Sequence, residues 1–368
     1  MIRPFVATLL LVAGCATMTP PAALELGPAM VARPVGVETS IEVFRPGEGP
    51  VTIDASSGLL NLVAWKEQLR AGSHELARAR HPISVTSWVP EGPARRGAPD
   101  EIRGTCVIVP GILGPNSSRH AVGPLLADDW AVVVVWPPVV PRVQDDLART
   151  RGMPDSERGA SAGLVVNELI EATAEVAQLR LLQVQLVHGG LRNKPVILVG
   201  ESMGALAGVG MASTGLVPHD AAVFIAGGGG YLDVARETSI RGILLANAPL
   251  ESEAFRSAFE KACDADPLRA AARLVGGPVV FVGAEADAIV PVPTQEALWQ
   301  ALGEPPRYRW SGGHLGLFMR GRETIAPILR AVAEEVSGRS RAAEAVFEAL
   351  PDVRPAFVDV DGRPMEVR

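Results

Sequence analysis

The sequence has little positive charge, and this limits the partners that the protein can bind. Its 368 residues include 34 Lys and Arg against 41 Asp and Glu, so the formal net charge is −7 at pH 7. Nucleic-acid-binding domains carry a basic surface that neutralises phosphate groups, so this balance argues against a nucleic-acid partner. The local basic cluster Arg95-Arg96 lies among prolines and glycines and is interpreted as a solvated loop.

Cysteine is also scarce, with three residues in the chain. Cys106 lies in an apolar strand pattern and is expected to be a buried, inert thiol, whereas Cys263 lies in a predicted helix. An oxidising compartment would also permit a disulfide between the two. Neither the spacing of these residues nor their neighbours indicates a metal site, and we expect neither a metal nor a cofactor.

The chain begins with an apolar run that is too short to cross a bilayer. Residues 5–13 give about nine apolar positions, whereas a membrane-spanning helix needs about 20. With a positive start at Arg3 and small residues before Cys15, the segment predicts a processing signal. The run Leu11-Val12-Ala13-Gly14-Cys15 resembles the lipobox of bacterial lipoproteins, which implies cleavage before Cys15 and acylation of its thiol. An ordinary secretory signal is the alternative. By the same resemblance, Ala16 implies the outer membrane of a bacterial cell envelope.

The most informative pattern that is present is Gly200-Glu201-Ser202-Met203-Gly204. It follows the apolar run 195–199 and precedes the small-residue stretch 205–210, so a strand is expected to lead through a sharp turn into a helix. In such a G-x-S-x-G turn the serine is strained and exposed. The glycines on either side prevent collisions with the strand and the helix. Ser202 is therefore the candidate nucleophile.

A second match to this pattern, Gly159-Ala160-Ser161-Ala162-Gly163, lacks that context. The residues before it are polar and broken by Pro154, so no strand can feed the turn. Ser161 is interpreted as a residue near the start of a long helix, whose periodicity is clear over 163–187.

A serine nucleophile needs a base within hydrogen-bond reach and an acid that orients the base. Among six histidines, His314 follows the strand pattern 307–310 and has glycines on both sides, which allow a close approach to another backbone. Asp287 follows the buried strand pattern 277–283 and is placed to accept the Nδ1 hydrogen of His314. The alternatives are a purely turn-capping role for Asp287 and Glu285 as the acid.

The remaining histidines fit surface positions. His120 is expected near the rim of the pocket, and the other four are interpreted as solvated residues in a polar helix or in connectors: His74, His81, His188 and His219.

The chain order Ser202, Asp287, His314 is the order of the α/β-hydrolases. The sequence resembles that superfamily over residues 82–336, on the motifs at 200–204, at 283–291 and at 313–316. The resemblance implies a serine hydrolase and names no substrate. The surroundings of His314 are also similar to distant relatives that act on polyhydroxyalkanoates. The polymerising members have cysteine in place of Ser202, which favours hydrolysis here.

The resemblance further implies two backbone donors for an oxyanion. One is the amide of Met203, directly after the nucleophile. The other lies in the loop after strand 105–109, where many relatives have His-Gly and this chain has Pro110-Gly111. Proline has no amide hydrogen, so Ile112 is the expected second donor. Leu113 and the side chain of Asn116 are alternative donors. The loop could also be a plain strand-to-helix turn that binds no oxyanion.

The other elements alternate between strands and helices. Strand patterns at 83–89, 131–136 and 221–226 predict an α/β fold with a mostly parallel doubly wound sheet and its site at the carboxyl ends of the strands. A segment at about 231–266, after the sixth strand, is interpreted as a lid. Its apolar face, Leu250, Phe255 and Phe259, would face either an acyl chain or the core. A helix is expected within 57–80.

These expectations divide the chain into a signal peptide (1–14), a lipidated tether (15–50) and an α/β-hydrolase domain (51–368) with a C-terminal extension at about 338–368. We expect a hydrolase that acts on a small-molecule or lipid ester through an acyl-enzyme and is attached to the membrane at Cys15. The alternatives are an acyltransferase or thioesterase, and a non-catalytic envelope binding protein. No oligomeric state is predicted.

Overall fold

The computed structural model describes the central part of the chain and several short terminal segments. The described residues are 18–19, 21, 24, 26–30, 40–43, 51–54, 67–71, 83–90, 102–187, 191, 194–241, 248–337, 357–358 and 364–365. The predicted signal peptide with Cys15, the Arg95-Arg96 loop, and His74, His81 and His188 lie outside them.

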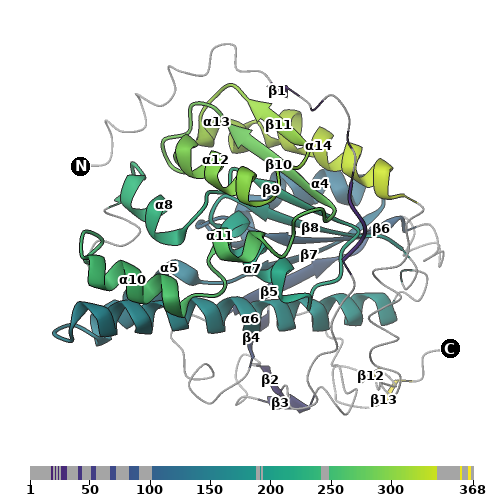
Figure 1. Cartoon of the computed structure of the whole chain (residues 1–368). Coiled ribbons are helices and arrows are strands. Elements are labelled where there is room, and N and C mark those ends of the chain that lie inside the picture. The colour runs from purple at the N-terminus through teal and green to yellow at the C-terminus, as the bar shows by residue number, and fades with distance from the viewer. Residues whose placement is uncertain are drawn as a thin grey trace, which may run out of the picture.

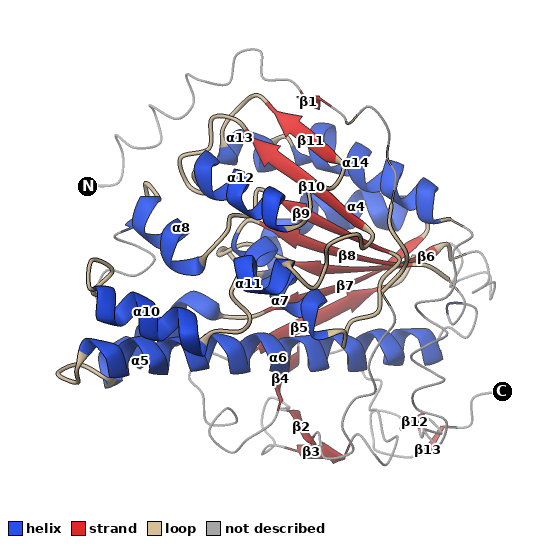
Figure 2. Cartoon of the chain, in the orientation of Figure 1, coloured by secondary structure: helices blue, strands red, loops and turns tan. Residues whose placement is uncertain are grey.

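One twisted sheet forms the centre of the molecule, with helices on both of its faces (Figure 2). Within the described residues, this sheet has eleven strands in the order β1-β11-β10-β9-β8-β6-β7-β5-β4-β2-β3, and the stretch from β11 to β7 is parallel throughout. The strands of this parallel part are β6 (Gly104–Val109), β7 (Trp130–Trp136), β8 (Val196–Glu201), β9 (Ala221–Ile225), β10 (Val279–Ala284) and β11 (Arg307–Trp310).

The parallel strands are apolar on both sides because helices cover both faces. On β6, Val107 contributes to one apolar cluster, while Cys106 and Ile108 contribute to the other. One face is covered by α5 (Val139–Arg149), α6 (Asp155–Val187), α7 (Met203–Thr214), α11 (Pro267–Ala271) and α12 (Val292–Ala301). The other is covered by α4 (Arg119–Ala127), α13 (His314–Met319) and α14 (Gly321–Val336) (Figure 1). This arrangement confirms the predicted α/β-hydrolase fold.

The N-terminal side of the sheet differs from expectation in two places. β4 (Glu67–Ala71) lies within the range predicted as a helix and pairs antiparallel with β5 (Ile83–Trp88), so the helix prediction is wrong there. β2 (Ser40–Val43) and β3 (Val51–Asp54) extend the same edge. At the opposite edge strand of the sheet, β1 (Met18–Thr19) pairs antiparallel with β11. A separate bridge joins Met30 to His219, which precedes β9. The expected tether is therefore partly docked on the domain.

The segment interpreted as a lid contains α8 (Tyr231–Glu237) and α10 (Glu253–Ala262), with 242–247 outside the described residues. Leu250, Phe255 and Phe259 are all buried, so the apolar face of this segment packs on the core. α10 lies along the N-terminal part of α6, which begins at Asp155 rather than near 163 (Figure 1).

The two cysteines within the described residues, Cys106 and Cys263, are both buried free thiols. Among the described residues, no helix combines the length and hydropathy that a bilayer span requires. At the C-terminus, β12 (Phe357–Val358) pairs antiparallel with β13 (Pro364–Met365).

Candidate active site

Ser202 occupies the sharp turn between β8 and α7. Its backbone has φ 57° and ψ −121°, a region that non-glycine residues seldom adopt. Such a conformation costs about 1–3 kcal/mol and persists when surrounding contacts hold it in place. Two contacts do so here: the Ser202 amide donates to the Ile225 carbonyl at 2.8 Å, and the Ala205 amide donates to the Ser202 carbonyl at 2.8 Å. The turn presents the serine hydroxyl at the carboxyl end of the sheet.

The glycines around Ser202 are required by close backbone contacts. A Cβ on Gly200 would lie 2.6 Å from the Cα of Ala205, and one on Gly204 would overlap the carbonyl oxygen of Val109. A Cβ on Gly111, in the loop after β6, would lie 3.2 Å from the Cβ of Ser202. The elbow and this loop are therefore packed directly against each other.

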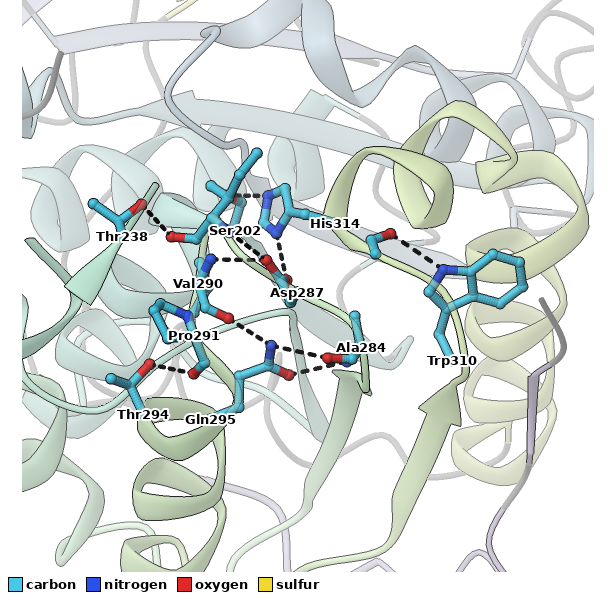
Figure 3. A network of polar contacts seen from close by, with 12 residues as sticks. Ser202, Thr238, Ala284, Asp287, Val290, Pro291, Thr294, Gln295, Trp310 and His314 are labelled. Carbon is cyan, nitrogen blue, oxygen red and sulfur yellow. Dashed lines mark hydrogen bonds and ion pairs between the residues drawn. The ribbon is translucent and has the colours of Figure 1, made fainter. Parts of the chain in front are cut away.

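The structure brings Ser202, His314 and Asp287 together in one hydrogen-bonded chain (Figure 3). The distance from Ser202 Oγ to His314 Nε2 is 2.8 Å, and that from His314 Nδ1 to Asp287 Oδ2 is 2.7 Å. A carboxylate only accepts, so Nδ1 carries the hydrogen and Nε2 is free to receive the serine proton. The residues are 9%, 7% and 6% exposed, respectively, which excludes most bulk water from the charges involved.

Asp287 also caps its own loop with its second carboxylate oxygen. Oδ1 accepts from the amides of Ile289 and Val290, each at 2.8 Å. The sequence allowed two roles for Asp287, orienting acid and turn cap. Its geometry fits both, because one carboxylate oxygen faces His314 and the other caps the turn. Glu285 is half exposed and lies 3.9 Å from Arg309, between Oε1 and Nη1, so the carboxylate beside His314 Nδ1 is that of Asp287.

Gln295 was not singled out from the sequence, yet it braces the loop that carries Asp287. Its fully buried amide group accepts from the Ala284 amide at 2.9 Å and donates to the Val290 carbonyl at 2.8 Å (Figure 3). The carbonyl of Ile289 is held by the Thr238 hydroxyl at 2.6 Å. No local motif marks Gln295, because its partners lie on either side of a turn that precedes it.

The two segments that carry the expected oxyanion donors lie beside one another. Met203 is the first residue of α7, and an amide in the first helical turn has no intrahelical acceptor. Ile112 and Met203 line the same small cavity, which places the two predicted donor segments side by side. Leu113 is 82% exposed, and the side chain of Asn116 lies outside the described ones.

An apolar cavity continues from this point under α8 and α10. It shares Val139, Val140 and Met203 with the cavity at Ile112. Its other lining residues are Val143, Ala162, Val166, Tyr231, Leu232, Ala235, Phe255 and Phe259.

The other described histidines and the second serine motif take different positions. His120 contacts Glu201, the residue before Ser202, with 3.1 Å between Nε2 and Oε1. His219 was interpreted as a surface residue, but it is fully buried, and its Nδ1 lies 2.9 Å from the Val217 carbonyl oxygen. Ser161 lies in α6, where its hydroxyl donates to Asp146 at 2.9 Å. Within the described ranges, no group of three His, Cys, Asp or Glu residues could hold a metal ion.

No family model and no curated protein matches this sequence. Solved structures align with it at low identity. TT1662 from Thermus thermophilus is 18% identical, with a TM-score of 0.42 over 68% of this chain and 94% of that chain. A highly thermostable carboxyl esterase from Bacillus coagulans is 13% identical, with a TM-score of 0.43 over 69% of this chain and 95% of that chain. Pyrococcus horikoshii acylaminoacyl peptidase is 15% identical, with a TM-score of 0.45 over 72% of this chain and 40% of that chain. Similarities at this level do not establish a shared activity.

Proposed function

We propose that this protein is a serine hydrolase that cleaves carboxylic esters through an acyl-enzyme. The observation that carries the proposal is the hydrogen-bonded chain Ser202, His314, Asp287 at 2.8 Å and 2.7 Å, with Ser202 held in a strained turn. A serine at a positive φ, bonded to a buried imidazole that a buried carboxylate orients, fits nucleophilic catalysis.

In the proposed reaction, His314 Nε2 takes the proton of Ser202 as Oγ attacks the ester carbonyl. The amides of Met203 and Ile112 donate to the negative oxygen of the tetrahedral intermediate. The protonated imidazole, stabilised by Asp287, then gives its proton to the alcohol that leaves. Water, deprotonated by the same imidazole, attacks the acyl-enzyme. The bond between the acyl carbon and Oγ then breaks, the carboxylic acid leaves, and the protonated His314 returns its proton to Oγ of Ser202.

The acyl group is assigned to the apolar cavity beside Met203. Burying each methylene of a chain there contributes about 0.8 kcal/mol, so the cavity favours esters with an apolar acyl part. The cavity has a volume of about 30 Å³, so it favours a short acyl chain. An acyl acceptor other than water would make the same site an acyltransferase, which product analysis distinguishes from hydrolysis.

The deciding experiment is covalent labelling. A fluorophosphonate probe followed by peptide mapping is expected to modify Ser202, and Ser202→Ala is expected to abolish labelling and p-nitrophenyl ester hydrolysis, with a loss of about 10⁶-fold in kcat. Ser161→Ala serves as the matched control, because Ser161 lies in the second G-x-S-x-G match and bonds to Asp146. Labelling that survives in Ser202→Ala would overturn the assignment.

We also propose that the mature chain is anchored in the bacterial envelope by acylation at Cys15, most simply in the outer membrane. The lipobox residues 11–15 support this proposal.

A further inference from the structure

The residue just before the nucleophile, Glu201, carries a buried carboxylate that the reaction described does not use. Glu201 is 1% exposed. The hydroxyl of Ser118 donates to its Oε2 at 2.6 Å, and Nε2 of His120 lies 3.1 Å from its Oε1. A buried charge is costly unless it is paired and hydrogen-bonded, so these two contacts account for its presence.

Glu201 affects the pKa values of two neighbouring side chains, His120 and Cys106. Burial lowers the pKa of His120, but the hydrogen bond and the negative charge of Glu201 outweigh it, and the pKa is raised overall. The thiol of Cys106, on the neighbouring strand, stays neutral because burial and then the charge of Glu201 raise its pKa. His120 and Glu201 thus form a hydrogen-bonded pair beside the elbow, with 3.1 Å between Nε2 and Oε1.

The pair joins segments that are separate in the sequence. Ser118 ends the turn η4 (Pro115–Ser118), which follows the loop with Ile112, and His120 lies in the first turn of α4. Glu201 ends β8 and is bonded covalently to Ser202. Its carboxylate therefore links the end of the Ile112 loop to the elbow that carries Ser202 and Met203.

A third segment meets the same pair. The ring of Phe318 lies between His120 and His314, with centroid distances of 5.8 Å and 5.0 Å. Phe318 and His314 share α13, so the ring connects the hydrogen-bonded pair to the base. Gly321, at the start of α14, lies against His120, and a Cβ there would be 2.5 Å from the ring.

We propose that His120 and Glu201 are a positioning pair, which holds the Ile112 loop against the nucleophile elbow and supports the ring of His314 through Phe318. The inference rests on the proposed hydrolase function. Neither residue touches the reacting atoms in this account. Their effect is to keep the donor segments and the base aligned with the developing oxyanion, where misplacement by about 1 Å can cost about 10²-fold in rate.

The test compares His120→Ala, His120→Gln and Glu201→Gln with wild type in p-nitrophenyl ester hydrolysis. Active sites are titrated with the fluorophosphonate, so that kcat is expressed per reactive Ser202. His120→Ala and Glu201→Gln are expected to lower this kcat by about 10-fold or more, which is less than the loss of about 10²–10³-fold on removing an oxyanion donor itself, with KM changed by less than about threefold. His120→Gln, whose amide can still donate to Glu201, is expected to recover much of the loss.

Phe318→Leu provides a variant that keeps the hydrogen-bonded pair and removes the ring contact, and it is expected to show a smaller loss in kcat. Glu285→Gln, at a half-exposed position, is the control. Unchanged kcat per active site in both His120→Ala and Glu201→Gln would overturn the proposal. So would equal losses in His120→Ala and His120→Gln, or a loss explained entirely by fewer reactive sites. A wild-type protein that neither labels nor hydrolyses esters would instead overturn the proposed function.

Discussion

At the residue scale, Asp287 shows how one carboxylate serves two neighbours. Oδ2 meets His314 Nδ1, while Oδ1 accepts from two amides of the following turn. The turn bonds prevent the side chain from rotating away, so the oxygen facing His314 stays in place. Gln295 adds a second restraint by bonding to both ends of the loop.

Asp287→Asn tests the charge without changing the shape. The amide keeps a similar volume, but it removes the negative charge that stabilises the protonated His314, so kcat is expected to fall by about 10⁴-fold. Steady-state ester hydrolysis measures the effect. Glu285→Gln is the matched control and is expected to cost little. The reverse ranking of the two variants, with both folded, would identify Glu285 as the acid.

A buried histidine remote from this chemistry predicts how stability depends on pH. His219 is fully buried, and burial lowers its pKa to about 4, although the hydrogen bond with the Val217 carbonyl acts in the opposite direction. In the unfolded chain a histidine has a pKa of about 6.5. Between these values the unfolded state binds a proton that the folded state does not, so stability falls as pH falls through this window.

The expected loss is up to about 3 kcal/mol between pH 7 and pH 4. Urea unfolding at several pH values measures it. His219→Gln, which cannot titrate, is expected to show a smaller dependence over the same range. An identical pH slope in the variant and in wild type would contradict the assignment of this dependence to His219.

At the element scale, the contact between α6 and α10 explains the second G-x-S-x-G match. A Cβ on Gly159 would overlap the carbonyl oxygen of Phe255, and one on Gly163 would lie 2.7 Å from that of Phe259. The two glycines lie four residues apart and therefore on the same face of α6. They allow α10 to approach closely, which places Phe255 and Phe259 against the core and in the wall of the apolar cavity.

Gly159→Ala is expected to destabilise the protein, although Gly to Ala within a helix usually stabilises by about 0.5–1 kcal/mol. The added methyl group forces α10 away from α6, and overpacking of this kind typically costs about 1–3 kcal/mol. Gly316→Ala in α13 is the matched control, because a Cβ there would meet only the Trp310 ring, at an ordinary contact distance of 3.7 Å. Thermal unfolding compares the two. Equal stability of both variants would show that α10 adjusts without cost.

At the scale of the whole molecule, the order of strands assembles the site from distant parts of the chain. Ser202 and His314 are 112 positions apart, and Asp287 lies 27 positions before His314. The parallel strands β8, β10 and β11 all end at one edge of the sheet, so the residues that follow them meet there. Near the carboxyl end of β11, Met18 of β1 pairs with Trp310, close to the loop that carries His314.

The proposed anchor at Cys15 predicts the behaviour of the whole protein. An acylated chain is expected to fractionate with membranes and to take up a fatty-acid analogue, whereas Cys15→Ala is expected to be unlabelled and largely extractable without detergent. Metabolic labelling of both forms measures this. Absence of label on the wild-type protein would indicate an ordinary signal peptide. Ester hydrolysis by Cys15→Ala is expected to persist, because the catalytic residues lie elsewhere.

Local rules were enough to predict several features from the sequence alone. Continuous apolar runs such as 131–136 predicted buried parallel strands, since only strands covered on both faces are apolar throughout. The glycines around Ser202 predicted the turn, because its backbone leaves no space for their side chains. Glycines beside His314 indicated a loop that can approach another backbone. These signals depend on a few neighbouring residues, and so they can be read without knowing the rest of the fold.

Other features depended on contacts between distant segments, and only the tertiary structure decided them. Asp287 and Glu285 follow the same strand, and the path of the loop alone placed Asp287 at His314. His219 resembled a surface residue in a connector, but the bridge with Met30 and the packing around it bury the ring. Gln295 and the pair of His120 with Glu201 carry no local pattern, because each acts on groups that become neighbours only after the sheet has formed.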